Sequence, residues 1–164
     1  MALLYRQIKN KFIEFIPLIL LFFTALNGNA IVTTQLFSFN FHYILIYFCV
    51  LRHPLSLGNG FIFLSGVISD VVYGLPLGAS ALTLLAIAAV AAYVRVVTVR
   101  ISLINDWITF IPALLIANLV YFIILNYSDI SIDYFNLLKN SLATLIFYPI
   151  FWGLFTILTN YIRD

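Results

Sequence analysis

Six apolar runs follow one another along the chain, separated by charged or turn-forming residues. A helix that crosses the hydrocarbon core of a bilayer needs about 20 apolar residues, and the runs approach or exceed that length. Clusters such as Asn27-Gly28-Asn29 and Arg52-His53-Pro54 interrupt them, because turn formers and charges mark the ends of helices. The pattern predicts an all-α chain with six membrane-spanning helices, at about residues 12–26, 37–51, 57–73, 77–97, 104–125 and 137–161.

Three local features refine this division of the chain. Residues 31–40 are apolar but include several polar side chains, so we interpret them as an interfacial segment leading into the second helix. The fourth run holds seven alanines, which predicts a central helix that its neighbours approach closely. Pro149 lies in the middle of the sixth run and is expected to kink that helix.

Composition identifies the solvent in which the chain folds. Of its 164 residues, 64% are hydrophobic and only 9% are charged, and the mean hydropathy is +1.11. Soluble domains are about half apolar and a quarter charged, and a domain this small buries only about 60–70% of its surface. These values argue against a soluble enzyme, a disordered tail and a nucleic-acid binder, and the single cysteine, Cys49, argues against a disulfide scaffold. They predict one integral membrane domain over residues 1–164, surrounded by membrane lipids.

The distribution of lysine and arginine predicts the orientation of the chain. Cytoplasmic loops of membrane proteins are enriched in both residues. With six crossings, seven of the eight fall on one side and only Lys139 on the other, which places both termini in the cytoplasm. A cleaved signal peptide is the competing interpretation of the N-terminus, but Glu14 and five further apolar runs favour a retained helix. The basic residues on the predicted cytoplasmic side are Arg6, Lys9, Lys11, Arg52, Arg95, Arg100 and Arg163.

The third run carries the most informative polar residue of the chain. Gly66, Asp70 and Gly74 are spaced four apart and therefore share one helix face. A carboxylate facing lipid is costly, so Asp70 is expected to face the interior, a partner or water. Two interpretations stay open: Asp70 caps or cross-links helices around the following turn, or it binds a substrate or an ion, or relays a proton. Candidate hydrogen-bond partners at similar depth are Asn118, Asn140, Ser141 and Thr144.

The residues that carry catalysis and metal binding are sparse in this sequence. His42 and His53 lie near opposite ends of the second run, and the chain has neither a metal-ligand motif nor a phosphate-binding glycine loop. We therefore assign no catalytic, cofactor-binding or metal-ligating residue and expect no enzymatic activity. A membrane enzyme would need an acidic or histidine cluster at one interface, which a single intramembrane aspartate does not supply.

The third run and the turn after it resemble a known family. Six short spans with both ends inside, and an alanine-rich fourth run, accompany a motif that is similar to the rod shape-determining protein MreD family. The positions that carry the resemblance are Phe63, Gly66, Asp70, Gly74, Pro76 and Gly78.

The resemblance implies a fold and a set of partners. The fold of that family is similar to the substrate-binding S-components of energy-coupling-factor vitamin transporters. The family acts without enzymatic activity in the bacterial inner membrane, where it is a partner of the single-pass protein MreC. It works with MreB, RodA and a class B penicillin-binding transpeptidase in side-wall peptidoglycan synthesis and so in cell shape.

Two function hypotheses from different classes are consistent with these features. In the first, the chain is a scaffold that binds a partner helix through its small-residue faces, with Gly66, Asp70, Gly74, Pro76, Gly78 and Asn118 as structural or partner-binding candidates. In the second, it is a small-molecule uptake component with a polar, outward-open pocket. Asp70, Asn118, Asn140 and Thr144 are the residues that would line such a pocket.

Overall fold

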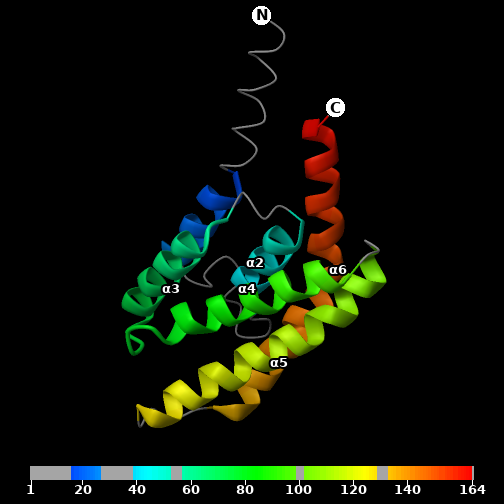
Figure 1. Cartoon of the computed structure of the whole chain (residues 1–164). Helices are drawn as coiled ribbons and strands as arrows, with labels where there is room; N and C mark the ends of the chain where they lie inside the picture. Colours follow the sequence, from blue (N-terminus) through cyan, green and yellow to red (C-terminus); the bar gives the residue numbers. More distant parts are fainter. Residues whose placement is uncertain (1–15, 27–38, 53–56, 99–101, 129–132, 164) are drawn as a thin grey trace, which may run out of the picture.

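The regular structure in the described part of the chain is entirely helical, as the apolar pattern predicted. The computed structural model describes residues 16–26, 39–52, 57–98, 102–128 and 133–163, and no strand occurs in these ranges. The predicted interfacial segment, apart from Phe39 and Asn40, lies outside them, as do the basic N-terminus and Arg100. The helices are Ile16–Leu26, α2 (Phe41–Arg52), α3 (Asn59–Tyr73), α4 (Ala79–Val97), α5 (Leu103–Tyr127) and α6 (Tyr134–Arg163) (Figure 1).

The helices fall into a long and a short class. By length and composition, α4, α5 and residues 134–157 of α6 could each cross a membrane. The described first helix has 11 residues, α2 has 12 and α3 has 15, fewer than the runs predicted. At 1.5 Å per residue, α2 covers only about 18 Å of a hydrocarbon core that is about 30 Å thick. Three crossings therefore have direct support from helix length, and the six-crossing arrangement stays a prediction.

Helix α4 occupies the centre of the molecule, as its alanine content predicted. It packs against α2, α3 and α5, while α6 packs against α5 and α2 (Figure 1). Small side chains on α4 allow these close approaches because little side-chain bulk separates the backbones of neighbouring helices. Four of its alanines are buried, at positions Ala79, Ala81, Ala88 and Ala91.

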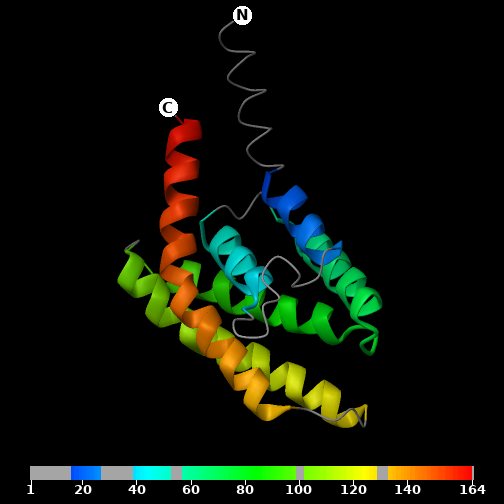
Figure 2. The same ribbon diagram turned by 180° about the vertical axis from the view of Figure 1, so that it is seen from behind.

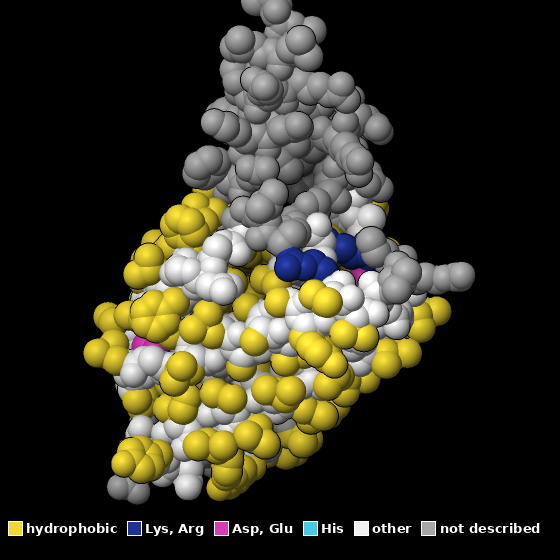
Figure 3. Space-filling view, in the orientation of Figure 1, with side chains coloured by type: hydrophobic (Ala, Val, Ile, Leu, Met, Phe, Trp, Pro, Cys, Tyr) yellow, Lys and Arg dark blue, Asp and Glu magenta, His cyan; other side chains and the backbone are white. Residues whose placement is uncertain are grey.

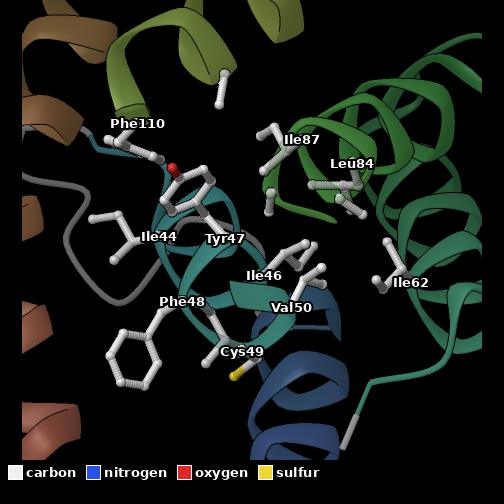
Figure 4. Close-up of a cluster of buried hydrophobic side chains, with 14 of the residues drawn as sticks. Ile44, Ile46, Tyr47, Phe48, Cys49, Val50, Ile62, Leu84, Ile87 and Phe110 are labelled. Atoms are coloured by element: carbon white, nitrogen blue, oxygen red, sulfur yellow. The ribbon is translucent and has the colours of Figure 1, made fainter. Parts of the chain in front are cut away.

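Helix α2 is the most enclosed element. The seven consecutive residues from Ile44 to Val50 are all buried, so no face of this part of the helix meets the surroundings. Tyr47 points towards Phe110 of α5, and these rings lie 5.0 Å apart (Figure 4). Tyr148 of α6 stacks on Phe110 at 4.4 Å. A helix that is apolar on all sides is stable when it is buried, and the surrounding helices enclose α2 in this way.

The outer surface of the described bundle is broadly apolar. Figure 3 shows hydrophobic side chains spread over the visible face, with few charges among them. An exposed apolar area this continuous is typical of a protein surrounded by lipid rather than water. On α6 the exposed apolar residues recur every three or four positions and form one stripe, made of Phe135, Leu138, Leu142, Ile146, Ile150, Leu154 and Ile157.

Helix α6 changes direction along its length (Figure 2), and Pro149 lies inside it. Proline has no backbone N–H, so the carbonyl of Leu145, four residues earlier, lacks its usual helical donor. The indole Nε1 of Trp107, from α5, donates to this carbonyl oxygen at 3.0 Å. A side chain of the neighbouring helix thus satisfies the acceptor that the proline leaves open.

Candidate functional site

Asp70 lies in the last turn of α3 and is fully buried. Its Oδ2 accepts a hydrogen bond from the backbone N–H of Gly78, and its Oδ1 accepts one from Ser80, both at 2.8 Å. These donors belong to the start of α4, where backbone N–H groups have no partner within the helix. The structure therefore shows the capping arrangement, with the carboxylate of one helix capping the next.

The turn between α3 and α4 makes this geometry possible. Gly74 ends α3 with a φ of 65°, and Gly78 precedes α4 with a φ of 99°, two left-handed conformations that glycine adopts without strain. Between them, the carbonyl of Pro76 accepts from the N–H of Ala79 at 3.1 Å. The chain thereby reverses direction and aims the positive end of the α4 dipole at Asp70. That dipole and the two N–H groups compensate a carboxylate that would otherwise be costly to bury.

Gly66 lies one turn before Asp70, where α3 and α4 approach each other closely. A Cβ atom built on Gly66 would lie 2.3 Å from Cα and 2.6 Å from the backbone nitrogen of Ala81. Such a side chain cannot be accommodated without separating the helices. Gly66 and Asp70 therefore face the interior of this chain. A Cβ on Gly74 or Gly78 would meet nothing within 4 Å, and it is their positive φ that favours glycine there.

The partners predicted for Asp70 were wrong. Asn118 donates from Nδ2 to Oγ of Ser141 at 2.7 Å, which joins α5 to α6. Thr144 accepts from the backbone N–H of Asn40 at 2.9 Å, and Nδ2 of Asn140 donates to Oδ1 of Asn40 at 3.3 Å. Both contacts join α6 to the start of α2. The polar residues predicted to line one pocket therefore lie between different pairs of helices. The prediction failed because side chains at equal depth on two helices need not face each other.

Asp106, in the first turn of α5, is a second buried carboxylate that the sequence-based prediction missed. It forms an ion pair with Arg52, at the end of α2, and accepts a hydrogen bond on Oδ2 from Nε1 of Trp152 at 3.0 Å. The guanidinium carbon of Arg52 also lies 5.4 Å from the centre of the Trp152 ring. Three helices therefore meet in one ionic and aromatic contact.

The sequence did contain a signal for this contact. Asp106 and Trp107 lie near the start of the fifth apolar run, at the same predicted side of the membrane as Arg52. An acidic residue at the start of a helix is also favoured by the helix dipole. Nothing in the spacing, however, indicated that Trp152 lies beside them, because contacts between distant helices depend on how the bundle packs.

Arg95, near the end of α4, lies close to the same part of the molecule. Its Nη1 donates to the carbonyl oxygen of Val50 at 3.1 Å, two residues before Arg52. Figure 3 shows the basic side chains of the visible face gathered at one place on an otherwise apolar surface. The carbonyl groups at the end of a helix favour such cations.

Comparison of the chain with family models, curated proteins and solved structures finds no match. The described residues contain no group of three or more His, Cys, Asp or Glu side chains placed to hold a metal ion. What the geometry does establish is that two buried carboxylates, Asp70 and Asp106, join helices of this chain to one another. Within the described residues the chain is all-α, and three of its helices are long and apolar enough to cross a membrane.

Proposed function

We propose that this chain is a non-enzymatic scaffold of the bacterial inner membrane that binds the membrane helix of a single-pass partner. The observation that supports the proposal is that both buried carboxylates are bonded to other groups of this chain. Asp70 caps α4, and Asp106 ties α5 to α2 and α6. Both act as acceptors inside the protein, which suits a molecule whose work is to present a fixed shape to another helix.

The resemblance of the third run to the MreD family gives the proposed partners. The single-pass protein is of the MreC type, and the assembly is the rod complex with MreB, RodA and a class B penicillin-binding transpeptidase. In that setting the chain supports side-wall peptidoglycan synthesis and cell shape. The positions of Gly66, Asp70 and Gly78 in the α3–α4 contact are consistent with a motif whose role is structural.

The proposed topology has six crossings with both termini in the cytoplasm. The ends of α3 and α5 lie towards one side of the molecule, at the lower left of Figure 1, and the end of α4 lies on the other. Arg52 and Arg95 belong to helix ends on this second side, joined through Val50. Gathered arginines at one end of the bundle support placing that end in the cytoplasm.

Co-purification of the chain with an MreC-type protein tests the proposal. We expect a stable complex in mild detergent, and tryptophan substitutions at exposed positions should locate the partner because a bulky ring disrupts close helix packing. Suitable positions, one on each of α3, α4, α5 and α6, are Val71, Leu82, Leu115 and Leu142. Substitution on the partner-binding face should reduce the recovered partner, while the other three variants serve as matched controls.

Two results would contradict the proposal. One is a folded, monodisperse chain that retains no MreC-type partner in any of several detergents. The other is a rise in melting temperature with a member of a vitamin panel, which would favour the uptake-component hypothesis instead.

A further inference from the structure

We propose that the part of α6 after Pro149 is a hinged arm, and that the contact between Arg52, Asp106 and Trp152 is the latch that holds it. The arm comprises residues 150–163, which follow the proline at the change of direction seen in Figure 2. This inference concerns a moving part of the fold and does not depend on which partner the chain binds.

The hinge rests on the backbone around Pro149. A proline inside a helix removes one backbone hydrogen bond and permits bending at that point. Here the carbonyl of Leu145 takes its hydrogen bond from Trp107 of α5 instead, at 3.0 Å. The carbonyl of Leu145 therefore has a donor although no intrahelical hydrogen bond crosses the proline. The arm can bend without breaking the bond from Trp107 to Leu145.

The latch lies immediately on the other side of the proline. Trp152, three residues after Pro149, donates to Asp106, which is the neighbour of Trp107 in α5. Two indole groups therefore join α5 and α6 in opposite directions, one before the proline and one after it. Because Asp106 is paired with Arg52, the latch also ties the arm to the end of α2.

Apart from the latch, the arm has ring contacts with α2 and with Phe39, which precedes that helix. Phe151 packs on Phe41 and Phe155 packs on Phe48, both of α2, with ring centres 5.0 and 5.2 Å apart. Its opposite face is exposed, at Ile150, Leu154 and Ile157. An element held on one face by a few side chains separates from the core more easily than one packed on every side.

The latched arrangement also leaves two buried donors without an acceptor among the described residues. They are Nε of Arg52 and the hydroxyl of Tyr148. Buried polar groups that lack a partner destabilise the state that contains them. Movement of the arm would change the surroundings of both groups, since Tyr148 directly precedes Pro149 and Arg52 belongs to the latch. An opened state that supplies a partner to either group would lie closer in free energy to the latched state.

Distance measurements between paired spin labels test the latch in the full chain. With Cys49→Ala as background, labels at Leu115 and Ile157, both exposed, would report the position of the arm relative to α5 in lipid nanodiscs. We expect one predominant distance for the parent. Trp152→Phe keeps an aromatic ring but removes the donor, and should raise a second, longer distance population by roughly tenfold.

Three further variants distinguish loss of the latch from a general loosening of the fold. Asp106→Asn should produce a smaller second population, because the amide oxygen can still accept from Trp152 although the charge that pairs with Arg52 is lost. Asp70→Asn, which alters the other buried carboxylate, should produce none. Pro149→Ala restores the backbone donor and should give one distance, shifted from that of the parent. An unchanged distribution in Trp152→Phe, or an equal change in Asp70→Asn, would overturn the proposal.

Discussion

Gly66→Ala is expected to lower the stability of the protein by about 3 kcal/mol, at the upper end of the cost of overpacking. The added Cβ would lie 2.3 Å from Cα and 2.6 Å from the nitrogen of Ala81. These are backbone atoms, which cannot rotate away as the end of a side chain can. The helices α3 and α4 would have to separate, and the change is measured as the loss of melting temperature in detergent.

Gly60→Ala is the matched control for this prediction. Gly60 lies on the same helix, and a Cβ there would meet nothing within 4 Å. The variant should remain within about 0.5–1 kcal/mol of the parent, the difference in helix preference between the two residues. If Gly66→Ala melted at the same temperature as Gly60→Ala, the close contact between α3 and α4 would be wrong.

Asp70→Ala is expected to cost roughly 3–6 kcal/mol, because two partly buried N–H donors lose a charged acceptor worth about 1.5–3 kcal/mol each. Asp70→Asn retains one acceptor oxygen and should cost about half as much. Both changes weaken the start of α4, the helix against which α2, α3 and α5 pack. Reversible unfolding in a mixed detergent would measure the differences.

Asp133→Ala provides a matched control at the surface. Asp133 accepts from the backbone N–H groups of Phe135 and Asn136 at the start of α6, but it is exposed. Exposed donors can turn to water or headgroups, so this cap should be worth only about 1 kcal/mol. Equal losses for Asp70→Ala and Asp133→Ala would contradict the buried cap as the origin of the larger effect.

Hydropathy predicted the helices well because their ends carry charges and turn formers. Runs predicted at residues 77–97 and 104–125 correspond to α4 at Ala79–Val97 and α5 at Leu103–Tyr127. Hydropathy did not identify α2 as the enclosed helix. A helix buried in protein and a helix facing lipid are both apolar, so their composition does not distinguish them.

The candidate site was predicted in part. The spacing of Gly66 and Asp70 indicated that they share an inward face, and the tight turn indicated that Asp70 could cap the next helix. Its actual partners, the N–H groups of Gly78 and Ser80, are backbone groups, which no pattern of side chains reveals.

The contact of Asp106 with Arg52 and Trp152 was missed for a different reason. Its members come from three helices that lie far apart in the sequence. Each one, taken alone, is an ordinary residue near the end of an apolar run or inside it. Their meeting depends on the rotation and bend of α6, which the apolar pattern leaves undetermined.

We propose that α4 crosses a membrane, with the capped turn of Asp70 outside and Arg95 inside. Cysteine labelling at the two ends of α4 tests it most directly, using the exposed positions Leu77 and Val97 in a Cys49→Ala background. With a maleimide that cannot cross membranes, we predict that intact spheroplasts are labelled at Leu77→Cys. Val97→Cys should react only after permeabilisation. Equal labelling of both positions in intact spheroplasts would contradict this topology.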